Sequence, residues 1–245
     1  MSALPKGWLT ADAVCVLALG WLYGGDLLDA LRAPTAPVAA MSALPSPGFP
    51  ALALAALAAA AVGAVVGVVR RRGAEFRGYR LLPVVALVVF FVDFFAVFGR
   101  GDPLGRAERV ALSLRHLAEQ AASLASVEAV PPARAVEPLL EGLPPPPYLV
   151  KGEPLARWTW EARTGCAGPA TEVAGLPAGT IVYCVAADRK LAWFTAVGLP
   201  LGRRFGEPGL VSQGPDALST VVSAAPAPEA DEEGAPFDGE DAGAP

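Results

Sequence analysis

The sequence predicts an α+β membrane protein, with about three transmembrane helices in its first part and a small antiparallel β domain later in the chain. Two apolar runs, residues 50–69 and 81–98, are each close to the roughly 20 helical residues that cross a hydrocarbon core about 30 Å thick. Residues 155–225 contain short runs that alternate between apolar and polar side chains, as strands do. The chain of 245 residues is 53% hydrophobic and only 18% charged, which is too apolar for an ordinary soluble protein.

A first apolar segment precedes these runs and predicts a transmembrane helix from about residue 8 to residue 25. The alternative is a cleaved signal peptide over residues 1–33, because Lys6 precedes a short apolar core that small residues follow. Both interpretations place residues 33–49, which are rich in proline and small residues, in an exposed loop outside the cytoplasm.

The loop between the second and third helices indicates the orientation in the membrane. It carries five arginines against a single glutamate, Glu75: Arg70, Arg71, Arg72, Arg77 and Arg80. Short loops with such an excess stay in the cytoplasm, so the third helix runs outward and the C-terminal domain is extracytoplasmic. Three arginines beyond that helix count mildly against this orientation: Arg100, Arg106 and Arg109. We therefore expect a multi-pass protein of the bacterial inner (plasma) membrane.

Two aspartates are the candidate polar residues of the helical region. Asp93 lies inside the apolar run FFVDFFAVF, where an ionised side chain costs roughly 2.5 to 3.5 kcal/mol on insertion scales. Asp26 is expected to end the first helix on the same side of the membrane. These residues either relay protons or cations, or they are structural groups that reach the interface, and the sequence leaves both hypotheses open.

The second helix carries small residues at intervals of four, a pattern that lets helix backbones approach closely. The stripe includes Ala55, Ala59, Gly63 and Gly67. It predicts a packing face either within the chain or between copies. The competing explanation is that alanine is common throughout this sequence.

Residues 100–130 predict an extracytoplasmic amphipathic helix that starts near Asp102 and Pro103. Its apolar residues recur at alternating spacings of three and four, which forms one seam. The seam is expected to pack on its own domain, with a short coiled coil as the alternative. Residues 131–154 are rich in proline and predict a stiff linker.

The predicted β domain covers residues 155–225. Its first strand places Trp158 and Trp160 on one face, either as core residues or as an interaction face that stacks a ligand. Residues 180–186 and 190–197 read as a hairpin, and a weaker strand is expected at 218–223. Cys166 and Cys184 could form a disulfide if the domain faces an oxidising compartment.

The last segment, residues 226–245, holds seven acidic residues and no basic one. It is expected to be disordered, and either solubilises the protein or binds a basic partner. Without those seven, the 24 acidic residues fall to 17 against 19 basic ones, so the near-neutral body gives no case for nucleic-acid binding.

The inventory of catalytic residues argues against an enzyme. The sequence contains none of the common hydrolase, metalloprotease, P-loop or dinucleotide-binding motifs. His116 is the only histidine, and a zinc site normally needs four ligands, so neither a metal nor another cofactor is expected.

In outline, a membrane helix followed by an amphipathic helix, a small antiparallel sheet and a cysteine pair resembles the type IV pilins, although here two apolar segments precede that helix. The leading hypothesis is a non-enzymatic membrane protein whose outer domain binds a protein partner, or a second copy, in an envelope assembly. The alternatives are an ion-coupled transport or channel subunit that uses Asp93, and a ligand-sensing receptor subunit that uses Trp158 and Trp160.

Overall fold

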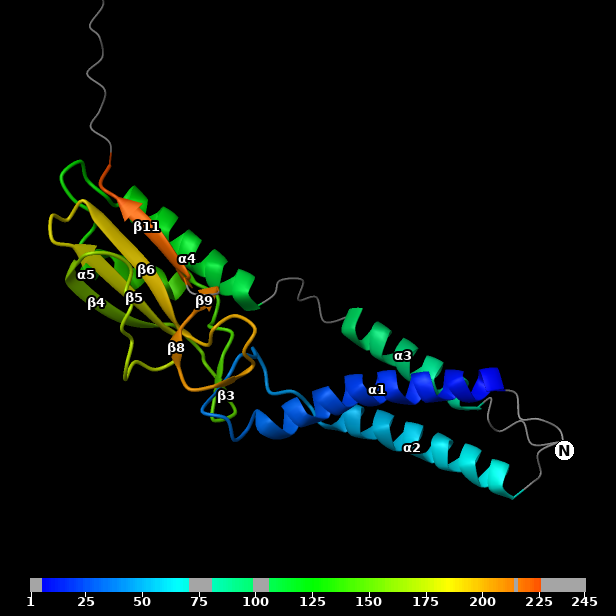
Figure 1. The fold of residues 1–245 in the computed structure, drawn as a ribbon. Coiled ribbons are helices and arrows are strands. Elements are labelled where there is room, and N and C mark those ends of the chain that lie inside the picture. Colours follow the sequence, from blue (N-terminus) through cyan, green and yellow to red (C-terminus); the bar gives the residue numbers. More distant parts are fainter. Residues whose placement is uncertain (1–5, 71–80, 99–105, 214–215, 226–245) are drawn as a thin grey trace, which may run out of the picture.

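The computed structural model describes residues 6–70, 81–98, 106–213 and 216–225. It is an α+β protein in which long apolar helices lie at one end and a β domain lies at the other (Figure 1). The arginine-rich loop 71–80, the start of the predicted amphipathic helix and the acidic segment 226–245 fall outside the described residues.

The apolar end is built from α1 (Lys6–Arg32), α2 (Gly48–Val69) and α3 (Leu81–Phe98). By length and composition, two stretches of the described helices suit a membrane crossing, Asp12–Arg32 in α1 and Gly48–Gly67 in α2, while α3 offers the shorter apolar stretch Leu82–Phe95. Length and composition therefore support two of the three expected membrane spans.

Helix α1 is longer than the predicted segment of residues 8–25. The residues after Asp26 are leucines, alanine and one aspartate, which are compatible with continued helix, so α1 ends only at Arg32. Asp26 accordingly lies inside the helix and not at its end, which corrects our expectation.

The main sheet of the β domain has the strand order β11-β6-β5-β4. Its strands are β4 (Thr159–Cys166), β5 (Thr180–Ala186), β6 (Leu191–Gly198) and β11 (Ser219–Ser223), and the short β8 (Gly209–Leu210) also pairs with β6. The antiparallel β5–β6 hairpin and the weaker last strand match the predictions.

One strand pairing differs from the predicted antiparallel domain, because β4 and β5 run parallel, with Thr159 opposite Thr180. Residues 167–179 carry the chain back along the sheet before β5 begins, as a parallel connection requires. The alternation of side chains identifies a strand but not the direction of its neighbour, so the sequence pattern did not reveal a mixed sheet.

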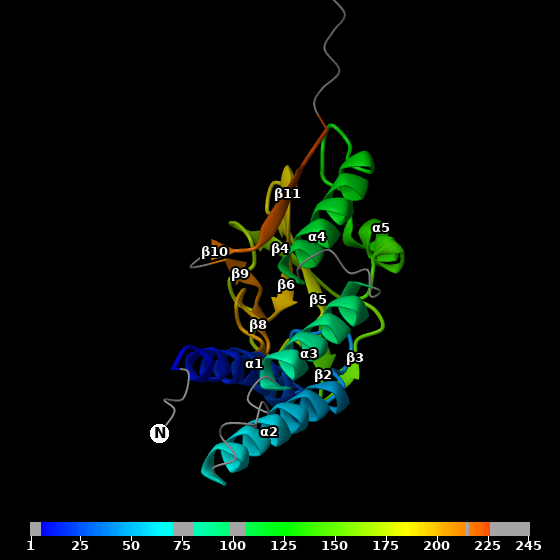
Figure 2. The same cartoon turned by 90° about the vertical axis from the view of Figure 1, so that its right-hand side faces the viewer.

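Helix α4 (Arg106–Ser123) covers one face of this sheet, against β11 and β6 (Figure 2). The predicted seam is buried there from Val110 to Ala121: Val110, Leu114, Leu117 and Ala121 are each at most 1% exposed. The helix ends at Ser123 and not near residue 130, which corrects its predicted end. Since the seam is filled by its own domain, it is not available for a coiled coil.

The segment 131–154, which we expected to be a linker, is folded onto the domain. It forms α5 (Ala133–Val136), the 3₁₀ helix η2 (Glu137–Gly142), β2 (Leu149–Val150) and β3 (Glu153–Pro154). Proline has no N–H to donate, but its carbonyl still accepts. Pro131 accepts a hydrogen bond from the Tyr183 hydroxyl at 2.8 Å, and Pro144 accepts one from the Trp158 indole at 2.8 Å.

The loop between α1 and α2 is also part of the domain. It contributes β1 (Val38–Ala39), which lies between β2 and β7 (Phe205–Gly206) in a second sheet of order β3-β2-β1-β7. Val38 is 2% exposed and Ala39 is fully buried, so the loop is not the exposed segment that we expected. A further short pair, β9 (Ser212–Gln213) and β10 (Asp216–Ala217), lies beside the main sheet.

Candidate functional site

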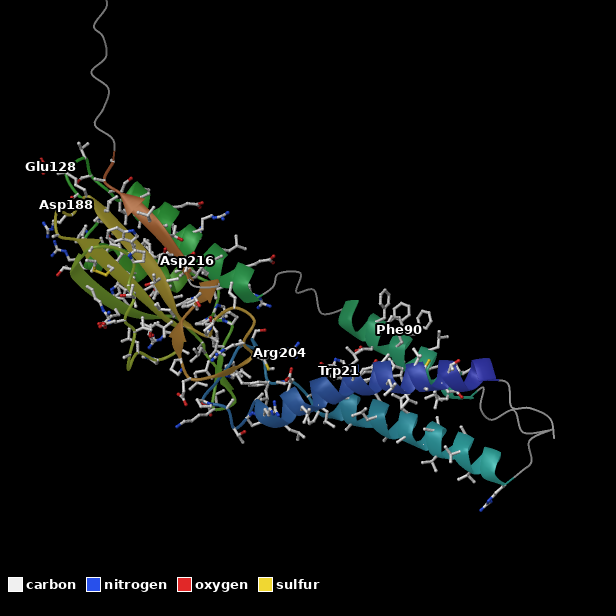
Figure 3. The ribbon with its side chains drawn as sticks, viewed as in Figure 1. Trp21, Phe90, Glu128, Asp188, Arg204 and Asp216 are labelled. Atoms are coloured by element: carbon white, nitrogen blue, oxygen red, sulfur yellow. A yellow bond between two sulfur atoms is a disulfide. The ribbon has the colours of Figure 1, made fainter. Side chains whose placement is uncertain are left out.

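The β domain meets the helices at the C-terminal end of α1, where Arg204 forms an ion pair with Asp29 (Figure 3). In the same place the Ala40 N–H donates to the Arg204 carbonyl at 2.9 Å. With β1 inserted between two strands of the domain, these contacts join the domain to α1 and α2. We call this end of the domain the proximal end.

A polar contact inside the helical region lies close to this junction. The Tyr23 hydroxyl of α1 donates to the Asp93 Oδ2 of α3 at 3.3 Å. The Tyr23 ring is 1% exposed and packs edge-to-face on Phe49 of α2, with 5.7 Å between ring centroids. Tyr23 therefore contacts both other helices. A tyrosine in an apolar run has no distinctive signature, so this role is not visible in the sequence.

Asp26 lies one turn beyond Tyr23 and is exposed, within electrostatic range of Asp93 and Arg204. The structure thus brings Asp93 and Asp26 near one another, with Tyr23 as the hydrogen-bond donor to Asp93. Within the described ranges, no three His, Cys, Asp or Glu side chains gather as metal ligands would.

The small-residue stripe of α2 is not the face that packs within the chain. Ala55, Ala59 and Gly63 are exposed and only Gly67 is buried. Ala53, Leu57 and Ala60, on another face of α2, are 2–7% exposed. The stripe of small residues thus contributes little to packing inside the chain. A contact of this stripe between copies of the protein stays a prediction.

The two tryptophans belong to the core. Trp158 is 4% exposed, and Trp160 stacks on Tyr183 with 5.5 Å between ring centroids. Tyr183 in turn stacks on Phe194 at 4.8 Å. An aromatic face that is already filled by neighbouring rings is not free to stack a ligand.

Cys166 and Cys184 form the predicted disulfide, which joins the parallel strands β4 and β5 with 5.8 Å between Cα atoms. The bond lies on the sheet face opposite α4, where residues 167–179 cover Val182 and Val197 through Ala170 and Val173. Cys15 of α1 is the free cysteine of the described chain.

An open cavity of about 510 Å³ lies at the end of the domain away from the helices, between residues 124–134 and the ends of β4 and β5. We call it the distal groove. Its apolar lining includes Leu124, Val130, Ala162 and Val185. Glu128 and Asp188 mark the same end of the domain in Figure 3.

Three arginines from separate segments line the distal groove: Arg134, Arg163 and Arg189. Arg163 Nη1 donates to the Glu172 carbonyl at 2.7 Å, and its Nε lies 3.8 Å from Glu161 Oε1. Among the described residues, the Arg134 and Arg189 side chains have no hydrogen-bond or ion-pair partner. They are therefore placed to receive an anionic group.

The groove also follows an open strand edge. Among the described strands of the main sheet β4 pairs only with β5, so its other edge presents backbone groups along Ala162 and Thr164, which line the groove. No local pattern in the sequence indicates this surface, because its arginines are far apart in the chain and meet only after folding.

Comparisons of the chain with protein-family models, with curated proteins and with solved structures found no match.

Proposed function

We propose that this chain is a non-enzymatic integral membrane protein whose C-terminal domain binds another protein in an envelope assembly. The observation that carries the proposal is the position of β1, a segment of the loop between α1 and α2 that forms an interior strand of the domain. A domain joined to its helices by a strand and an ion pair is suited to present a surface at a fixed distance from a membrane.

The membrane part of the proposal includes α3 as a third span. Its 18 residues would extend about 27 Å at 1.5 Å per residue, which is close to the thickness of the hydrocarbon core. Large apolar side chains cover its outer surface, among them Phe90, Phe91 and Phe95 at 47–69% exposure. Trp21 of α1 is 86% exposed, and side chains of this kind are stable in lipid but unfavourable in water.

The extracytoplasmic placement is supported by the disulfide, since such bonds persist in oxidising compartments. The arginine excess of residues 70–80 argues for the same orientation independently. We therefore propose the bacterial inner membrane, with the β domain on the outer side.

The distal groove is the surface that we propose for docking. It combines an apolar lining, two arginines (Arg134 and Arg189) without side-chain partners among the described residues, and a strand edge that no described strand covers, which together suit an extended acidic segment of a protein. The segments that line the groove, residues 124–134 and the ends of β4 and β5, lie at the end of the domain opposite the junction with α1 (Figure 1). In the proposed orientation a partner reaches this end without contacting the bilayer.

Copurification from the native host in mild detergent, with mass spectrometry, tests this function. We expect a distinct envelope protein in fixed ratio to the wild-type chain. Recovery would fall at least severalfold for the double variant Arg134→Gln/Arg189→Gln and stay unchanged for Arg157→Gln/Arg203→Gln, which changes two exposed arginines elsewhere. Recovery of the chain alone, or only with copies of itself, would contradict the proposal.

A second candidate, an ion-coupled transport or channel subunit, is favoured by the contact between Tyr23 and Asp93 within the helices. Its test is Asp93→Asn, which keeps an acceptor for the Tyr23 hydroxyl but removes the charge. Loss of ion-dependent uptake in vesicles at unchanged protein level would support transport. Unchanged uptake and growth would leave Asp93 with a structural role.

A further inference from the structure

We propose that the distal groove binds the acidic segment of the same chain, residues 226–245, so that the segment covers the docking surface until a partner displaces it. This inference rests on the proposed function in taking the groove as a protein-binding surface. It adds the identity of an occupant and a means of regulation.

The path of the chain supports this occupant. After β11 the Ala224 N–H donates to the Lys190 carbonyl at 2.8 Å, and the Ala225 N–H donates to the Ser126 carbonyl at 2.9 Å. Ser126 lines the distal groove. The chain therefore leaves the described part at the rim of the groove, and a few residues at about 3.3 Å each suffice to enter it.

The charges of the segment and the groove are complementary. Residues 226–245 carry seven carboxylates and no basic group. Among the described residues that line the groove there are three arginines and no Asp or Glu. Glu161 partly neutralises Arg163, but Arg134 and Arg189 keep their forked donors for carboxylates.

The apolar features match as well. Leu124 is 48% exposed at the groove, and Phe237 is the one large apolar residue of the segment. The open edge of β4 offers backbone donors and acceptors to an extended chain. Acidic residues that flank a single aromatic thus fit a groove with arginines beside an apolar lining.

The tether makes even a weak contact effective. A segment attached next to its site has an effective concentration in the millimolar range for a short flexible connection. An affinity of tens of micromolar measured for the free segment would therefore correspond to a groove that is mostly occupied in the intact chain. A partner would have to compete with this contact.

The test uses the full-length chain in detergent and a fluorescent peptide with the sequence of residues 226–245. The receptor is a variant in which the seven carboxylates are replaced by amides, so that the groove is vacant: Glu229→Gln, Asp231→Asn, Glu232→Gln, Glu233→Gln, Asp238→Asn, Glu240→Gln and Asp241→Asn. We expect saturable binding by fluorescence anisotropy at low salt, and at least severalfold weaker binding to the wild-type chain, whose own segment competes.

Two matched variants of that receptor locate the peptide. Adding Arg134→Gln/Arg189→Gln should weaken binding at least tenfold, whereas adding Arg157→Gln/Arg203→Gln should leave it unchanged. Absence of saturable binding, or equal loss with both pairs, would overturn the inference. Binding of a polyglutamate peptide without binding of residues 226–245 would also overturn it, and would assign the groove to an acidic partner instead.

The outcome is separable from that of the proposed function. Peptide binding without any copurified partner would leave this inference standing while the docking function fails. A partner that requires Arg134 and Arg189, with no binding of the peptide, would support the docking function and contradict the inference.

Discussion

The Tyr23 hydroxyl donates a hydrogen bond to the Asp93 carboxylate across 3.3 Å and so joins α1 to α3, while the Tyr23 ring packs on Phe49 of α2. An aspartate in an apolar helix is costly without a polar partner. One buried tyrosine therefore both satisfies Asp93 and holds the helices together.

Replacing Tyr23 with phenylalanine keeps the ring but removes the hydrogen bond. We expect Tyr23→Phe to destabilise the helical region by about 0.5–2 kcal/mol, the range found for hydrogen bonds between membrane helices. Thermal unfolding in detergent measures the effect, with Trp21→Phe on the exposed face of α1 as the control. Equal melting temperatures for Tyr23→Phe and the wild type would show that the bond contributes nothing.

Removing the disulfide should loosen the β4–β5 pairing. Cys166→Ser/Cys184→Ser releases a cross-link between residues 18 apart in sequence, and loops of this size typically stabilise by about 3 kcal/mol. We expect a lower unfolding midpoint, and a matching decrease when the wild type is reduced. Cys15→Ser is the control and should leave the sensitivity to reductant unchanged. A midpoint that does not respond to reductant would contradict the disulfide.

Gly198 in β6 has no room for a side chain, because a Cβ there would overlap the Tyr148 ring. Overpacking of this kind costs about 1–3 kcal/mol, so Gly198→Ala should lower the stability of the domain. Gly209→Ala is the matched control, since Gly209 is the register partner of Gly198 and has open space around its Cβ position. Similar chemical denaturation curves for both variants would contradict the predicted packing.

Burial raises the pKa values of Tyr148 and Tyr183 to about 12, from the ordinary tyrosine value of 10.0. The folded state thus prefers neutral tyrosines. The stability that comes from these raised pKa values is fully present below pH 10, where the tyrosines are protonated in both the folded and the unfolded state. It is lost as the pH rises from 10 through 12, because the tyrosines of the unfolded chain ionise in this range before those of the folded chain. Denaturation midpoints between pH 8 and 12 should fall in the wild type and fall less steeply in Tyr183→Phe.

Much of the domain was predictable because its side chains follow a simple period. Leu114 and Leu117 continue a helical seam, and the strands around residues 180–197 are bounded by a polar turn. The cysteine pair was also visible in the sequence. These features depend on local patterns, and the structure confirms them.

The features that the sequence did not reveal depend on contacts between distant segments. Val38 and Ala39 form a strand too short to show a period, and their partners lie more than a hundred residues later. The prolines between 131 and 147 suggested a linker, but their carbonyls accept hydrogen bonds from core aromatics. The parallel pairing of β4 is likewise decided by the neighbouring strand.

The candidate sites likewise include residues that a local sequence pattern identifies and residues that only the folded structure brings together. Asp93 stood out as a charge in an apolar helix, but its donor Tyr23 is 70 residues away in sequence. Trp158 and Trp160 were correctly placed on one face, although β4 begins only at Thr159, and only the folded domain shows that this face is filled. The arginines of the distal groove have no common motif, so no inspection of the sequence would have grouped them.

The most direct test of the account is lysine crosslinking with mass spectrometry in native membranes. Lys190 lies at the distal end, where its Nζ donates to the Val127 carbonyl at 3.3 Å, and Lys151 lies in the β2–β3 turn at the proximal end. We predict that crosslinks to one envelope partner concentrate on Lys190 and decrease in Arg134→Gln/Arg189→Gln. Partner crosslinks confined to Lys151, or none to any other protein, would contradict docking at the distal groove.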